Sequence, residues 1–159
     1  MAHQQHPFTP LNIALLTISD TRSFENDGSG DALVQLIEEA GHRLARRELC
    51  RDDVYALRHV VSGWIRDPDV HVVISTGGTG LTARDSTPEA LAPLFDRVVT
   101  GFGELFRQIS HHEVGSSTLQ SRALAGLANR TLVFCLPGST NACRTAWNGI
   151  LREQLDASH

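Results

Sequence analysis

Apolar residues along this chain form short continuous runs that are separated by segments with helical periodicity. Three runs are almost entirely apolar, which is typical of strands buried on both faces of a sheet; they cover Leu11–Ser19, Val70–Thr76 and Arg130–Leu136. Weaker patterns predict two further strands, over Arg43–Cys50 and Arg97–Thr100.

Helical patterns fill the segments between these strands. We expect helices over Asp31–Ala40, from an N-cap at Asp52 to Ile65, from Thr87-Pro88-Glu89 onward, and over Phe102–Glu113, Thr118–Leu127 and Thr140–Leu155. Strands that alternate with helices predict an α/β fold, a three-layer α/β/α sandwich with a mostly parallel sheet. We expect one domain over residues 1–159, with residues 1–9 as a flexible lead-in.

Composition narrows the possible functions. All 14 basic residues are Arg and the chain has no Lys, which excludes a Schiff-base lysine and the lysine of a P-loop. The net charge is -4 and no basic block occurs, which argues against nucleic acid as a partner. The three Cys residues show no C-x-x-C spacing, and neither a signal peptide nor a membrane-spanning run is recognisable, so we expect a cytoplasmic protein with no membrane partner.

The three most apolar strands all end in small or polar residues, in the segments LLTISD, VVISTGGTG and VFCLPGST. Ligands of parallel sheets bind at the carboxyl ends of the strands, so these ends predict a site. The most informative end is Gly77-Gly78-Thr79-Gly80, where three glycines let a ligand approach backbone N–H groups closely. The alternative is a tight turn that needs positive φ angles. A phosphate group is the ligand expected for such a loop.

The loop fits neither common phosphate motif. A P-loop needs the missing lysine. The segment from Gly78 to Ala83 matches the dinucleotide pattern G-x-G-x-x-A, but Pro88 places the following helix too late for a dinucleotide-dependent oxidoreductase. A second turn, Pro137-Gly138-Ser139-Thr140, leads from a strand into a helix, where it could hold an anion or could simply cap the helix.

Two carboxylates lie near these turns. Asp85 follows the glycine loop and Asp52 stands at the head of a predicted helix. A loop ion pair and a helix cap are the structural alternatives for them. If phosphates occupy the cleft, the two carboxylates could instead hold Mg²⁺, which typically uses one or two carboxylates together with phosphate oxygens.

At these turns the sequence resembles the MoaB/MogA family of molybdenum-cofactor biosynthesis, more closely MoaB than MogA. The resemblance extends over nearly the whole chain from Leu11 and is carried by the segments LLTISD, ISTGGTGLTARDSTPEAL, GFGELFR, STLQSRALAG and LPGSTNACRTAW. It implies a ligand, molybdopterin, and self-association into trimers or hexamers. It also implies the reaction of active members, which transfer AMP from Mg-ATP to the terminal phosphate of molybdopterin.

The resemblance also suggests site residues. Asp52 and Asp85 align with the two functionally important aspartates, which are the expected catalytic and Mg²⁺-binding residues. Substrate contacts are expected from Ser19, Asp20, Gly77, Gly78, Thr79, Gly80, Glu104, Ser121, Arg122, Pro137, Gly138 and Ser139. One feature departs from the pattern: transferring relatives carry Lys or Asn and then Pro where this chain has Ser139-Thr140. A pterin-binding protein without ATP turnover therefore remains the alternative.

Overall fold

The protein is described by a computed structural model in which residues 6–159 are placed. These residues form a six-stranded sheet with the strand order β2-β1-β3-β6-β5-β4. The parallel part contains β1 (Asn12–Ile18), β2 (Arg43–Cys50), β3 (Val72–Thr76) and β6 (Thr131–Leu136). At one edge, β5 (Leu124–Ala128) and the two-residue β4 (Arg97–Val98) pair in antiparallel fashion.

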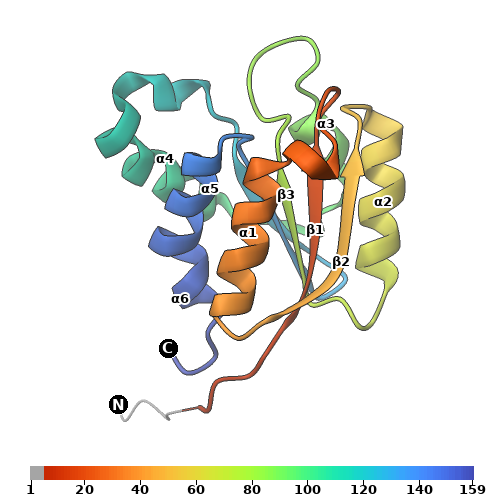
Figure 1. The fold of residues 1–159 in the computed structure, drawn as a ribbon, viewed down its shortest axis with the longest axis vertical. Helices are drawn as coiled ribbons and strands as arrows, with labels where there is room; N and C mark the ends of the chain where they lie inside the picture. The colour runs from red at the N-terminus through yellow and green to blue at the C-terminus, as the bar shows by residue number, and fades with distance from the viewer. Residues whose placement is uncertain (1–5) are drawn as a thin grey trace.

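Helices cover both faces of the sheet (Figure 1). One face carries α1 (Gly28–Glu39), α4 (Thr100–Val114), α5 (Thr140–Ala146), the π-helical turn η4 (Trp147–Leu151) and α6 (Arg152–Gln154). The other face carries α2 (Val54–Arg66) and α3 (Thr87–Leu91), which is followed by the short η2 (Ala92–Leu94). The expected three-layer α/β fold is therefore confirmed.

Alternating strand residues divide the core into two clusters. Ile13 and Leu15 of β1 face α1 and Trp147, whereas Ala14 and Leu16 face α2 and Trp64. All six of these side chains are buried. A strand that buries both faces cannot show polar alternation, which explains why β1 is continuously apolar in the sequence.

The helix expected over Thr118–Leu127 is wrong. The 3-10 turn η3 (Gly115–Gln120) ends helical structure there, and Leu124–Ala128 forms β5. The turn to β6 uses Asn129 and Arg130 at φ angles of 47° and 69°, the left-handed conformation of two-residue hairpins. Ala and Leu favour helices intrinsically, but pairing with β6 overrides that preference.

Two predicted helix starts also move. Asp27, not a residue near Asp31, caps α1 by accepting from Gly30 N at 3.0 Å. Asp53, not Asp52, caps α2 by accepting from Ala56 N at 2.8 Å. Each shift follows from local chemistry, because the true cap is the carboxylate whose backbone lies just outside the first turn.

The remaining expectations concern the thiols and the lead-in. Cys135 and Cys143 are free and buried, and burial raises the pKa of these thiols to about 12 and about 11. Of the expected lead-in, residues 1–5 lie outside the described part, and residues 6–9 carry no regular structure. Within residues 6–159, no helix combines the length and the apolar character needed to cross a membrane.

Candidate functional site

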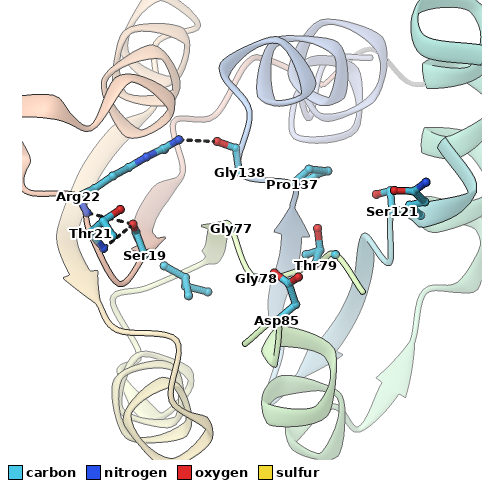
Figure 2. Close-up of a pocket in the computed structure, with 13 residues that line it drawn as sticks. Ser19, Thr21, Arg22, Gly77, Gly78, Thr79, Asp85, Ser121, Pro137 and Gly138 are labelled. Carbon is cyan, nitrogen blue, oxygen red and sulfur yellow. Dashed lines mark hydrogen bonds between the residues drawn. The ribbon is translucent and has the colours of Figure 1, made fainter. Parts of the chain in front are cut away.

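A cavity of about 510 Å³ lies at the carboxyl ends of β1, β3 and β6. Its thirteen lining residues come from the end of β1, the glycine loop after β3, the turn after β6 and the segment before β5 (Figure 2). They are Ile18, Ser19, Thr21, Arg22, Gly77, Gly78, Thr79, Gly80, Asp85, Gln120, Ser121, Pro137 and Gly138. The three strand ends singled out in the sequence therefore do converge.

The glycine loop requires its glycines. Gly77 and Gly78 have φ angles of 109° and 72°, which side chains rarely adopt. A Cβ on Gly77 would collide with the Ile18 carbonyl oxygen, and one on Gly78 would collide with the Thr87 hydroxyl. The tight-turn explanation of these residues is thus correct.

The hydrogen bonds of the loop leave a row of donors free. Its carbonyls are engaged: Thr87 Oγ1 donates to Gly77 O at 2.9 Å, Thr87 N to Gly78 O at 3.0 Å and Arg122 N to Thr79 O at 2.8 Å. In contrast, the amide N–H groups of Gly78, Thr79 and Gly80 donate to no other group within residues 6–159. Consecutive free N–H groups beside a cavity are the arrangement found in backbone anion sites.

The second turn lies against this loop. A Cβ added to Gly138 would stand 3.4 Å from the Gly77 Cα, so the two turns pack together. Pro137 and Gly138 line the cavity, but Ser139 does not; its hydroxyl caps α5 by accepting from Ala142 N at 3.1 Å. For Ser139, the capping alternative therefore describes the observed contact.

The side chains of Asp52 and Asp85 both lie against the glycine loop. Asp52 Oδ1 accepts from the backbone N of Ser86 at 3.2 Å and from its hydroxyl. Asp85 Oδ2 accepts from the backbone N and hydroxyl of Thr82 at 2.9 and 2.7 Å. Asp85 lines the cavity, whereas Asp52 lies behind Gly78, with Oδ2 3.0 Å from the position of an added Cβ.

Each of these carboxylates keeps one oxygen without a hydrogen bond from the described residues, Oδ2 of Asp52 and Oδ1 of Asp85. No cluster of three or more His, Cys, Asp or Glu side chains within residues 6–159 could enclose a metal by itself. Two carboxylates would hold Mg²⁺ only together with phosphate oxygens and water.

Two other expected contact residues are used elsewhere. Asp20 accepts both Nε and Nη2 of Arg84 at 2.9 Å, and this guanidinium lowers the pKa of the Asp20 carboxyl. Arg122 supports the glycine loop by donating to Gly80 O at 2.8 Å and Asp85 O at 2.9 Å. Asp20, Arg122 and the exposed Glu104 of α4 are not among the cavity-lining residues, whereas Ser19 and Ser121 are.

The sequence did not single out four lining residues, Ile18, Thr21, Arg22 and Gln120. Ile18 and Thr21 flank the predicted strand end, so their place could have been inferred from that end. Ser19 Oγ accepts from the backbone N of Thr21 at 3.2 Å and of Arg22 at 3.1 Å, which folds this segment back over the cavity. Nothing in the sequence distinguishes Arg22 from the other arginines.

Comparisons with known proteins agree with this geometry. A family described as "Probable molybdopterin binding domain" matches residues 14–157. Molybdenum cofactor biosynthesis protein B of Escherichia coli K12 is 54% identical over 99% of this chain and 92% of that protein, and the Bacillus subtilis 168 protein of the same name is 40% identical over 96% and 91%.

Solved structures show the same likeness. A crystal structure of molybdenum cofactor biosynthesis protein B superimposes with a TM-score of 0.90 at 43% identity, covering 92% of each chain. The tungsten cofactor synthesizing protein MoaB from Pyrococcus furiosus gives 0.76 at 34% identity, covering 91% of this chain and 92% of the other. This chain belongs to the MoaB/MogA family of molybdenum-cofactor biosynthesis proteins.

Proposed function

We propose that this protein binds molybdopterin in the cavity and transfers AMP from Mg-ATP to the terminal phosphate of the pterin. The observation that carries the proposal is the row of free amide N–H groups of Gly78, Thr79 and Gly80 at the cavity wall. Such groups bind phosphate oxygens without a lysine. Membership of the family supports molybdopterin as the phosphate ester.

The reaction requires no proton transfer by a side chain of the protein. A phosphate oxygen of the pterin attacks the α-phosphorus of ATP, the bond from that phosphorus to the bridging oxygen breaks, and pyrophosphate leaves. Because the attacking oxygen is already anionic, no general base is needed. The protein instead has to align two anions that repel each other and stabilise the charge that develops between them.

Asp52 Oδ2 and Asp85 Oδ1 are the groups that would hold Mg²⁺, since neither accepts a hydrogen bond from the described residues. When bound, the metal supplies positive charge to the nucleotide phosphates. The bonds from Ser86 and Thr82 fix the other oxygen of each carboxylate and so keep the two groups oriented.

A second candidate function is molybdopterin binding without ATP turnover. It is favoured by the second turn, where Ser139 caps α5 and no cationic side chain takes the position of the lysine found in some transferring relatives. The binding cavity is the same in both functions, so only chemistry separates them.

The deciding experiment incubates the purified protein with molybdopterin and Mg-ATP and measures adenylylated pterin and pyrophosphate. Asp52→Asn keeps an oxygen for Ser86 but removes the charge; we expect transfer to slow at least about tenfold while pterin affinity changes little. The neighbouring Asp53→Asn is the matched control, since Asn also caps helices. Pterin binding without pyrophosphate release would favour the second candidate, and absence of pterin binding would contradict both.

We also propose that the chain forms a homo-oligomer, with a trimer as the smallest unit and a hexamer as the larger one. Phe102 and Phe106 of α4 are buried in the core, but Leu105, Val114 and Leu119 are 43%, 49% and 70% exposed. Large apolar side chains that remain exposed on a monomer can mark an interface. Light scattering at micromolar concentration tests this proposal, because the mass of a monomer would contradict it.

A further inference from the structure

The cavity contains one cationic side chain. Among the thirteen lining residues, Arg22 is the only Lys or Arg, and Asp85 is the only carboxylate. Other arginines near the site serve the protein itself: Arg84 is bound at two atoms by the Asp20 carboxylate, and Arg122 is committed to Gly80 O, Asp85 O and the Glu89 carboxylate. The hydrogen-bond partners of Arg22 are of a different kind from those of Arg84 and Arg122.

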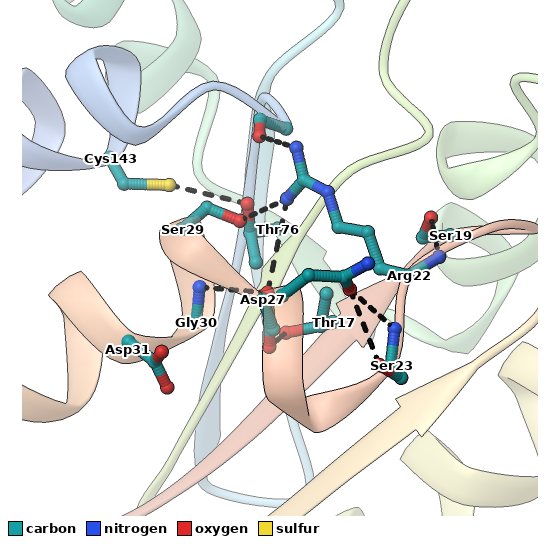
Figure 3. Close-up of polar contacts among 12 residues, drawn as sticks. Thr17, Ser19, Arg22, Ser23, Asp27, Ser29, Gly30, Asp31, Thr76 and Cys143 are labelled. Atoms are coloured by element: carbon teal, nitrogen blue, oxygen red, sulfur yellow. Dashed lines mark hydrogen bonds and ion pairs between the residues drawn. The ribbon is translucent and has the colours of Figure 1, made fainter.

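Neutral oxygens hold the Arg22 guanidinium in place (Figure 3). Nη1 donates to Ser29 Oγ at 2.7 Å, and Nη2 donates to the carbonyl oxygen of Gly138 at 3.2 Å. These bonds tie the segment after β1 to α1 and to the turn after β6, so the side chain is fixed across the edge of the cavity. A guanidinium has five N–H groups, and the bonds to Ser29 and Gly138 use two of them.

The nearest carboxylate, Asp27, neutralises Arg22 only in part. Asp27 Oδ1 lies 3.8 Å from Arg22 Nη1, beyond hydrogen-bond distance. The fully buried Asp27 side chain accepts shorter bonds from Arg47 Nη2 at 3.2 Å, Thr17 Oγ1 at 2.6 Å and Gly30 N at 3.0 Å. Because Arg47 provides the direct ionic partner of Asp27, the charge of Arg22 is compensated only in part, and three of its N–H groups donate to no other group within residues 6–159.

We propose that Arg22 is the residue that grips a phosphate group of the ligand, in the place of the lysine that this chain lacks. A guanidinium held on one side presents a planar pair of donors that matches two phosphate oxygens, and bonds of this kind are charge-assisted. Arg22 and the free amides of the glycine loop line different sides of the cavity (Figure 2). The guanidinium and the amides would therefore hold the anion between them. The inference rests on the phosphate binding proposed above, and it concerns the phosphate of either the pterin or the nucleotide.

The test compares the binding of four probes by calorimetry: molybdopterin, Mg-ATP, pyrophosphate and inorganic phosphate. The variants are Arg22→Gln, which removes the charge, and Arg22→Lys, which keeps the charge but loses the planar fork. Arg46→Gln is the matched control, because Arg46 is exposed, pairs with Asp67 and does not line the cavity. Circular dichroism and the melting temperature establish that each variant is folded.

We expect Arg22→Gln to weaken binding of at least one probe by about 10- to 100-fold, as for loss of a hydrogen bond between charged groups, with Arg22→Lys in between and Arg46→Gln within about twofold of wild type. A loss for molybdopterin alone assigns the pterin phosphate to Arg22, and a loss for Mg-ATP alone assigns the nucleotide. If wild type binds pyrophosphate or phosphate through Arg22 but not molybdopterin, the inference holds and the proposed function fails. Unchanged affinity of folded Arg22→Gln, or no binding of any probe to wild type, overturns the inference.

Discussion

Replacement of Asp27 by Asn should destabilise the protein far more than the same change at Asp31. Arg47 Nη2 contacts both carboxylates, Asp27 at 3.2 Å and Asp31 at 2.7 Å. The two differ in environment, because the Asp27 side chain is 0% exposed and that of Asp31 is 59% exposed. Because both carboxylates contact Arg47, comparing the two variants separates the effect of burial from the effect of contact distance.

The expected magnitudes follow from this difference. Loss of one partner from a buried ion pair costs about 3–5 kcal/mol, and in Asp27→Asn the partly buried Arg47 would keep only the exposed Asp31 as an ionic partner. Arg47 is vulnerable to this loss, since its Nε is already buried without a partner among the described residues. The helix cap itself survives in Asp27→Asn, because Asn caps as well as Asp. Loss of the exposed pair in Asp31→Asn costs at most about 1 kcal/mol.

Urea unfolding at pH 7 measures both changes, and thermal melts should show Asp27→Asn lower by roughly 6–20 °C, at about 2–4 °C per kcal/mol for a domain of this size. Far-UV circular dichroism checks that the variants retain their secondary structure. Equal losses for the two variants, or a loss below about 1 kcal/mol for Asp27→Asn, would refute the view that the buried carboxylate is the centre of this network.

Two further predictions concern the glycine turns and a buried histidine. Gly78→Ala should lower the free energy of unfolding by about 1–3 kcal/mol because of its positive φ and its contact with Thr87, while Gly138→Ala, whose Cβ meets only ordinary contacts, should stay within about 1 kcal/mol; similar losses in urea titrations would contradict this reasoning. Burial lowers the pKa of His42, despite an opposing effect of Asp156, and its Nδ1 accepts from Leu11 N at 3.0 Å. His42 therefore binds a proton more readily in the unfolded chain than in the folded protein. The neutral, buried His42 contributes fully to stability above about pH 6.5, and its contribution is lost as the pH falls. The stability difference between wild type and His42→Gln should shrink from pH 8 to pH 5.5, and a constant difference would count against the assignment.

Three strands of the parallel part, β1, β3 and β6, were predictable from the sequence because burial on both faces leaves a local signature. In β1, Leu15 and Leu16 point to opposite core clusters, so the run is apolar throughout. The strand β5 left no such signature. Its residues, LAGLA, favour a helix intrinsically, and its strand state depends on β6 and on Phe95, whose ring lies where a side chain on Gly126 would stand.

The residues of the site also include some that the sequence could predict and some that it could not. The glycine loop could be found because its backbone conformation demands glycine at Gly77 and Gly78, which the sequence displays. Arg22 could not be found, because its position depends on Ser29 of α1 and on the carbonyl of Gly138, more than one hundred residues away in the chain. Side chains that are placed by tertiary hydrogen bonds carry no local pattern.

The charges around the cavity favour an anion at one side and a cation at the other. Asp20 and Arg84 neutralise each other outside the cavity, so they add little to its net charge. What remains are two sets of groups: the guanidinium of Arg22 at one side of the cavity, and the carboxylates of Asp85 and Asp52, which lie beside the glycine loop and its free amides, at the other. A lone phosphate can bind to the first set without help, whereas a triphosphate that reaches the carboxylates would be repelled unless a divalent cation accompanied it. If the proposed reaction takes place, this asymmetry favours the pterin phosphate at Arg22 and Mg-ATP at the two aspartates.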